Sequence, residues 1–118
     1  MKDFEIISDG SCDLSDEAVS KLGIRVVPFY VAYDEESYLK EKVDFQVQEF
    51  YQKLMDNPGV FPKTSMPTAE DYCQEFQKAF ELNKNILCIT ISKKFSGSLN
   101  SALMARDMFL EEHPDARV

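Results

Sequence analysis

Residues 85–103 read Asn-Ile-Leu-Cys-Ile-Thr-Ile-Ser-Lys-Lys-Phe-Ser-Gly-Ser-Leu-Asn-Ser-Ala-Leu, and this stretch decides the fold. Its first part, 85–92, is a near-continuous apolar run, which is typical of a strand in a parallel sheet covered on both faces. A polar loop follows over 93–98. An apolar stripe at helical spacing then predicts a helix over 98–112. The stripe consists of Leu99, Ala102, Leu103, Phe109 and Leu110, with the stem of Arg106 at its margin.

Two further strands are expected nearer the N-terminus, over Phe4–Ser8 and Ile24–Tyr33. Pro28 lies inside the second strand, which indicates an edge position or a bulge because proline cannot donate to a ladder. The alternation of strands with helices predicts an α/β fold, with a mainly parallel sheet flanked by helices. A chain of 118 residues is expected to form one domain.

Three more helices are expected from their end signals. Ser15 caps the first and Gly23 ends it. The second starts at Asp44, stops at 57–59 and buries Val47, Phe50, Tyr51 and Leu54. Thr68 caps the third in a capping box with Asp71, and its core face consists of Tyr72, Cys73, Phe76, Ala79 and Phe80. Residues 60–67 hold two prolines and are expected to be irregular.

The charge balance excludes some functions. With 21 acidic and 13 basic side chains, the chain carries a formal net charge of −8. A phosphate backbone repels such a surface, which argues against nucleic-acid binding. The same charge argues against docking to anionic lipid headgroups. The longest apolar stretch, within 24–33, is far too short for a transmembrane segment.

Cysteine and histidine usage argues against a metal site. The chain has three widely spaced cysteines, no Cys-x-x-Cys pair and one histidine, His113. A Cys/His zinc site therefore lacks ligands, and no metal is expected. Three isolated thiols fit a reducing compartment, so we expect a cytoplasmic protein.

Hydroxyl-rich loops follow two of the expected parallel strands. Residues 9–13 come after the first strand and Ser96-Gly97-Ser98 after the last one. Ligands of open parallel sheets bind beyond the carboxyl ends of the strands, and the segment 62–67 can reach the same rim. Hydroxyls together with free helix N–H groups form a receptor for a carboxylate or a phosphate. The alternative is that these hydroxyls only cap helices.

Enzymatic interpretations lack essential parts, so no catalytic residue is expected. Ser96 is not in a nucleophile elbow, and His113 stands at the far end of a helix. Asp9-Gly10-Ser11 is similar to the nucleophile loop of haloacid dehalogenase-type phosphotransferases, but Ser11 occupies the place of the second aspartate. A small hydrolase or phosphotransferase that uses the Asp9 or Ser96 loop remains the alternative function, and an interaction module is the third.

Four motifs in order resemble the DegV family of fatty-acid-binding proteins, over essentially all 118 residues. They are Ile7-Ser8-Asp9-Gly10-Ser11-Cys12-Asp13-Leu14, Ile24–Pro28, Pro62-Lys63-Thr64-Ser65-Met66-Pro67-Thr68 and Ile91-Ser92-Lys93-Lys94-Phe95-Ser96-Gly97-Ser98-Leu99-Asn100-Ser101-Ala102. The chain departs from the family pattern at Gly10, at Met66 and at Ser92-Lys93.

The resemblance implies that residues 1–118 are the N-terminal α/β lobe of a two-domain protein whose second domain is absent from this chain. The implied ligand is one long-chain fatty acid, with no other cofactor. Thr64 and Ser96 are expected to hold its carboxylate, with Ser65, Gly97 and Ser98 beside them. The resemblance also implies a carrier for a fatty acid kinase.

The end of the chain, Asp115–Val118, reads like the start of another strand, so we expect a fragment. A lobe without its second domain is expected to expose apolar surface and to self-associate.

Overall fold

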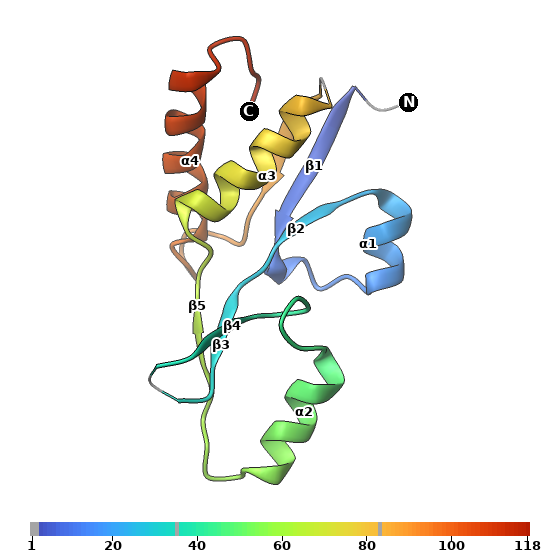
Figure 1. Cartoon of the computed structure of the whole chain (residues 1–118), viewed down its shortest axis with the longest axis vertical. Coiled ribbons are helices and arrows are strands. Elements are labelled where there is room, and N and C mark those ends of the chain that lie inside the picture. The colour runs from blue at the N-terminus through green and yellow to red at the C-terminus, as the bar shows by residue number, and fades with distance from the viewer. Residues whose placement is uncertain (1–2, 35, 83) are drawn as a thin grey trace. The chain divides into compact units, whose positions relative to one another are not determined.

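The computed structural model describes residues 3–34, 36–82 and 84–118 of the chain (Figure 1). Its contacts divide into two compact units, which the sequence analysis does not predict. Unit 1 consists of Met1–Val27 and Pro67–Val118, and unit 2 is the continuous segment Pro28–Met66.

Unit 1 is built on a three-stranded sheet in the order β2-β1-β6, and all of its strands are parallel. The central strand places Ile7 opposite Arg25 of β2 and opposite Cys88 of β6. The predicted parallel sheet is therefore confirmed, with its strands near the predicted positions. Their bounds are Phe4–Asp9 for β1, Arg25–Val27 for β2 and Asn85–Ile89 for β6.

The helices of unit 1 begin and end at the predicted signals. The Ser15 hydroxyl accepts the Ala18 N–H at 3.1 Å, and Gly23 ends the helix at a φ of 67°, which favours glycine. The capping box of Thr68 and Asp71 is present in full. The bounds are Gly10–Cys12 for the 3-10 helix η1, Asp16–Leu22 for α1, Ala69–Glu81 for α3 and Ser98–Glu112 for α4.

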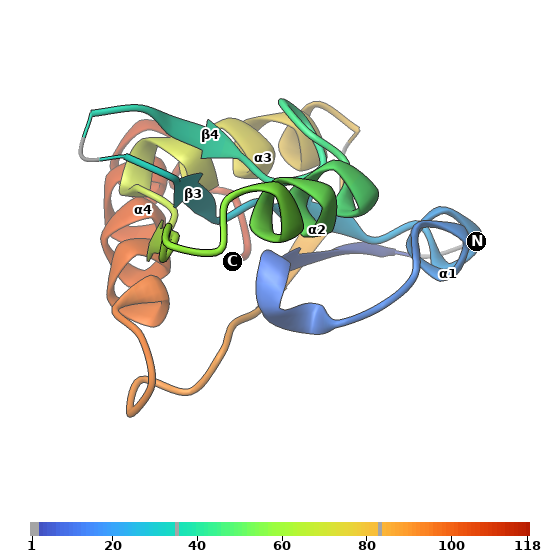
Figure 2. The same cartoon turned by 90° about the horizontal axis from the view of Figure 1, so that it is seen from below.

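α3 and α4 lie side by side (Figures 1 and 2) and pack on one face of this sheet. The rings of Phe76 on α3 and Phe109 on α4 meet edge to face, with centroids 6.0 Å apart. The predicted core face of α3 is confirmed: three of its members are buried, and Cys73 and Phe80 pack against them. The core consists of Ile7, Val27, Tyr72, Phe76, Ala79, Ile86, Ala102, Ala105 and Phe109.

The opposite face of β6 is open, so the expectation of a strand covered on both faces is wrong for this chain. Ile86 and Cys88 face α3 and α4, and because side chains alternate along a strand, Leu87 and Ile89 point the other way. These two residues are 49% and 51% exposed. The structure therefore has the apolar surface that the sequence analysis expects.

The last residues, 115–118, form no strand, although the sequence reads like one. The Arg117 carbonyl accepts the Ile86 N–H at 2.8 Å, and Ala116 and Val118 pack against the core. The segment therefore lies along the edge of β6 and makes one ladder-like hydrogen bond with it.

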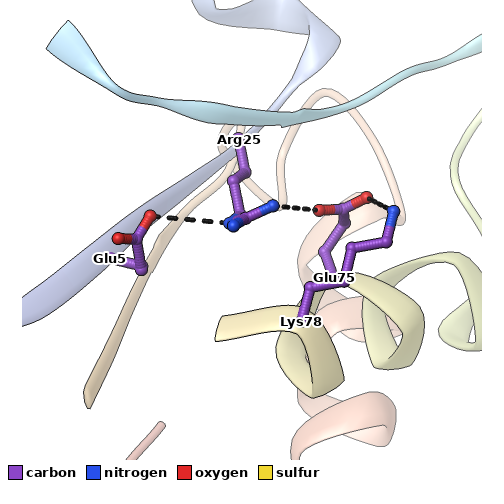
Figure 3. A network of polar contacts seen from close by, with 4 residues as sticks. All are labelled: Glu5, Arg25, Glu75 and Lys78. Carbon is purple, nitrogen blue, oxygen red and sulfur yellow. Dashed lines mark hydrogen bonds and ion pairs between the residues drawn. The ribbon is translucent and has the colours of Figure 1, made fainter. Parts of the chain in front are cut away.

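An ion-pair network joins the edge strand β2 to α3 (Figure 3). Arg25 Nε lies 3.5 Å from Glu5 Oε2, and Arg25 Nη1 lies 3.7 Å from Glu75 Oε2. Lys78 Nζ lies 3.0 Å from Glu75 Oε1 on the same helix. Both Arg25 distances are longer than a good hydrogen bond, so these pairs orient the strand more than they stabilise it.

Unit 2 is an antiparallel sheet with one helix. The strands lie in the order β4-β3-β5, with Val31 of β3 opposite Leu39 of β4 and Thr64 of β5. Phe50 of the helix meets the rings of Tyr33 and Phe45 at centroid distances of 6.1 and 6.2 Å. The bounds are Tyr30–Ala32 for β3, Tyr38–Lys40 for β4, Val47–Asp56 for α2 and Lys63–Ser65 for β5.

The strand expected over Ile24–Tyr33 is wrong as one element, because Pro28 divides it into β2 and β3. Proline has no N–H to continue a ladder. Phe29, the next residue, instead donates its N–H to Glu41 Oε1 at 3.2 Å. The chain passes from unit 1 to unit 2 at this proline.

Two other expectations for unit 2 are corrected. Asp44 does not start α2: its carboxylate accepts the Lys40 N–H at 2.8 Å and closes a turn, and α2 begins three residues later at Val47. Residues 60–67 are not wholly irregular, because Lys63–Ser65 forms β5. β4 was not predicted.

No helix in the described ranges combines the length and the apolar character needed to cross a membrane.

The core of unit 1 leads to a stability prediction. Phe76 is fully buried, so Phe76→Ala should lower the free energy of unfolding by about 3–5 kcal/mol. Phe95 is 82% exposed, so the matched change Phe95→Ala should alter it by less than about 0.5 kcal/mol. Urea unfolding followed by circular dichroism measures both, and equal losses would contradict the assignment of the core.

Candidate functional site

The carboxyl ends of β1 and β6 bring the Asp9 loop and the Ser96 loop to one edge of the unit 1 sheet. The two strands are parallel neighbours, so the segments that follow them leave at the same edge. This edge is where open parallel sheets bind ligands. The structure thus brings together two of the three segments that the sequence analysis assigns to the rim.

Asp9 is the centre of this edge. Its side chain is fully buried, and both carboxylate oxygens accept hydrogen bonds. Oδ1 accepts from the Ser11 N–H at 3.1 Å and from the Ser11 hydroxyl. Oδ2 accepts from the Ile91 N–H at 3.0 Å and from the Ser98 hydroxyl at 2.8 Å. Four donors therefore surround the carboxylate and tie both loops to it.

Ser98 is buried and its hydroxyl proton is already in use. A carboxylate only accepts, so Ser98 must donate to Asp9. The Tyr72 hydroxyl lies 2.5 Å from Ser98 Oγ and must then be the donor in that bond. Burial raises the pKa of Tyr72 above its ordinary value, which keeps its proton in place.

Ser96 has the opposite arrangement. Its Oγ accepts the Ser98 N–H at 3.1 Å, and in the described part of the chain its own proton goes to no other group. The side chain is half-buried. Gly97 is the N-cap of α4 and has no side chain to cap it, so among the described residues the Ser98 N–H has a side-chain acceptor, Ser96 Oγ, while the Leu99 and Asn100 N–H groups have none. The Ser96 hydroxyl is therefore an available donor next to a partly capped helix start.

The φ of Gly97 is −79°, which any residue can adopt. The backbone conformation at position 97 therefore does not require glycine. The expected role of Gly97, which is to let a ligand approach the backbone closely, stays a prediction. Lys93, Lys94 and Phe95 precede it as an exposed turn, whose Phe95 N–H donates to the Ser92 carbonyl at 2.9 Å.

Thr64 and Ser65 lie on β5 of unit 2, where both are exposed and neither caps a helix. Thr64 shares a face with Val31, its partner in the ladder, and both line a groove of about 260 Å³. The groove walls are mostly apolar and aromatic. Its residues are Val31, Glu41, Lys42, Phe45, Val47, Phe50, Tyr51 and Thr64. Val47 and Tyr51 of the predicted α2 stripe are thus exposed rather than buried.

Because Thr64 belongs to unit 2 and Ser96 to unit 1, their approach to one carboxylate stays a prediction. What sequence reasoning missed is the structural role of Asp9 and Tyr72. An aspartate at the end of a buried strand was the available signal, and it was interpreted as a possible nucleophile.

The enzymatic alternatives fit poorly. Asp9 is buried with both oxygens occupied, so it is not open to attack a phosphoryl group. His113 packs against Phe80 and Phe109, each at 4.6 Å between ring centroids. It follows the last turn of α4, about 22 Å from the start of that helix. A Ser96–His113 pair is therefore excluded by distance.

The described residues contain no cluster of three or more His, Cys, Asp or Glu side chains that could hold a metal ion.

The parallel sheet, the hydroxyl loops at its edge and the enclosed Asp9 define an α/β lobe with a candidate ligand-binding edge. The chain belongs to the DegV family, whose profile, described as that of an uncharacterised protein, matches residues 3–118. The resemblance found in the sequence is thereby confirmed.

Three relatives support this assignment. A DegV domain-containing protein of Clostridium acetobutylicum is 35% identical over 97% of this chain and 39% of its own length. A fatty acid-binding protein of Thermotoga maritima is 31% identical over 86% of this chain and 35% of its own length. The crystal structure of a stearic acid-binding protein from Eubacterium ventriosum matches with a TM-score of 0.92 at 42% identity, over 97% of this chain and 39% of that one. The chain spans about two fifths of the length of these relatives.

Cys88, on the same face of the sheet as Asp9, gives a pH prediction. Burial, with the negative charge of Asp9 as a second cause, raises the pKa of its thiol to about 11. The thiolate is the reactive form, so alkylation by iodoacetamide should be slow at pH 8 and should rise about tenfold per pH unit up to pH 10. Mass spectrometry of a variant with Cys12→Ser and Cys73→Ser measures this rate. A plateau by pH 9, as for an ordinary thiol of pKa about 8.5, would contradict the prediction.

Proposed function

We propose that this chain holds a long-chain fatty acid, with Thr64 and Ser96 as donors to its carboxylate, and that it acts as part of a carrier rather than as an enzyme. The observation that carries the proposal is the available proton of Ser96 beside the partly capped start of α4. A hydroxyl donor and helix N–H groups favour an anion. The names of the Thermotoga and Eubacterium relatives support a fatty acid as that anion.

The head-group site is proposed to use its residues unequally. Ser96 donates the proton of its hydroxyl to the ligand. Ser98 does not donate to the ligand, because its hydroxyl already donates to Asp9, and its N–H only holds Ser96 Oγ in place. Thr64 and Ser65 make no side-chain hydrogen bond within the described residues, so their hydroxyls are available to a ligand. Lys93 and Lys94, two exposed cations near Ser96, offset the negative charge of the chain locally.

The tail is proposed to supply most of the affinity. Each methylene removed from water contributes about 0.8 kcal/mol, so ten of them contribute about 8 kcal/mol. The aromatic groove beside Thr64 is an apolar surface on which part of a tail can lie. The hydroxyls then select the orientation of the ligand, and the rest of the tail requires apolar surface beyond this groove.

A fatty acid kinase is proposed as the recipient of the bound acid, as the family resemblance implies. Incubation of the loaded protein with a fatty acid kinase and ATP tests this, because acyl phosphate should form only when both proteins are present. The lipid that copurifies with the protein, identified by mass spectrometry, tests the class of ligand.

The head-group assignment leads to a binding prediction. Ser96→Ala should weaken fatty-acid binding by about 1.5–3 kcal/mol, the range for a hydrogen bond to a charged group. The double change of Thr64 and Ser96 to alanine should weaken it further and leave the binding that the tail provides. Isothermal calorimetry on the intact protein measures both.

Ser15→Ala is the matched control, because Ser15 caps α1 and is not part of the rim. It should lower stability by about 1 kcal/mol and leave affinity unchanged. If Ser96→Ala behaves like this control, with a lower melting temperature and unchanged affinity, Ser96 is only a structural residue and the carboxylate role is wrong.

A further inference from the structure

The hydrogen bonds around Asp9 run in one direction. Asp9 can only accept, which makes Ser98 a donor to it and Tyr72 a donor to Ser98. The Ser98 N–H is occupied by Ser96 Oγ, and the Ile91 N–H by Asp9 Oδ2. Among these groups, the Ser96 hydroxyl is the one whose proton remains for a ligand.

We propose that Asp9 is the positioning residue that makes this edge of the sheet selective for an acceptor-only head group, a carboxylate, over a head group that also donates. This inference rests on the proposed function and deepens it. Asp9 acts by anchoring the 91–98 loop and does not touch the ligand.

The negative charge of Asp9 is compatible with an anionic ligand nearby because hydrogen-bond donors around the carboxylate stabilise that charge. Two N–H groups and two hydroxyls point at its oxygens, and the side chain has no exposed surface. A buried carboxylate that accepts hydrogen bonds at both oxygens in this way fixes the donors around it.

Loss of Asp9 would change two things at once. The Ile91 N–H loses its acceptor, so the loop that carries Ser96 loses its anchor at the end of β6. The Ser98 hydroxyl also loses its acceptor, and because Ser98 is fully buried this change reaches the ligand only through the position of the loop. A displaced Ser96 hydroxyl weakens its bond to a carboxylate, which is charge-assisted, more than its weaker neutral bond to an alcohol oxygen.

The test compares two ligands with one tail, hexadecanoic acid and 1-hexadecanol, delivered from cyclodextrin to the intact protein and measured by calorimetry. The tail contributes equally to both, so the ratio of their affinities reports the head-group site alone. Asp9→Ala should lower the acid-to-alcohol ratio about tenfold, the lower end of the effect of one hydrogen bond to a charged group.

Asp9→Asn is the rescue variant. Its amide oxygen can face Ile91 and Ser98 and accept both of their bonds, while its amide nitrogen faces Ser11, whose hydroxyl can turn to accept and whose N–H loses its acceptor. The 91–98 loop keeps its anchor, so the ratio should return to within about threefold of the wild-type value. Ile86→Val, a core change away from the rim, is the stability control. It should lower the melting temperature without changing the ratio.

Equal weakening of both ligands in Asp9→Ala, with an unchanged ratio, would show that Asp9 is only structural and would overturn the proposal. If Asp9→Ala does not fold, Ser98→Ala decides. Because its hydroxyl has no proton left for the ligand, its loss should lower the ratio by less than about threefold. A loss as large as that of Ser96→Ala overturns the proposal. Absence of any acid binding by the wild type would instead refute the proposed function.

Discussion

The set of hydrogen bonds to the fully buried carboxylate of Asp9 is the interaction on which the proposed ligand-binding edge of unit 1 depends. Its four hydrogen bonds join the end of β1, the end of β6 and the start of α4. A buried charge is costly unless every lone pair has a donor. The loops must therefore keep the conformations that supply those donors. The side chain that the sequence suggests as a nucleophile is instead the reason the edge holds its shape.

Sequence reasoning succeeds here where the determining contacts are local. The Ser15 cap, the capping box at Thr68 and the apolar run of β6 depend on residues a few positions apart. The role of Asp9 could not be predicted in this way, because its bonds reach 82 and 89 residues along the chain to Ile91 and Ser98. The strand at 63–65 was missed for the same reason, since its pairing with Tyr30–Ala32 is what makes it a strand.

The two units divide the expected chemistry. Unit 1 provides a hydrogen-bonded polar edge with the available proton of Ser96, and unit 2 provides a threonine beside aromatic walls. A fatty acid has the same two parts, a small charged head and a long apolar tail. Rigid donors suit the head because orientation matters there. The tail tolerates a less specific surface, since burial is non-directional.

Unit 2 is one uninterrupted segment between two parts of unit 1, with Pro28 at its start and Pro67 immediately after it. Tyr30 and Ser65 are partners in its ladder, so the segment enters and leaves at the same end of its own sheet. This is the connectivity of an inserted domain. Because its two ends lie close together, the segment can be exchanged without a change in the path of the unit 1 chain. Evolution could therefore vary the segment, and with it the apolar walls, while the Asp9 edge stayed unchanged. Chimaeras of related lobes have natural joining points at these two prolines.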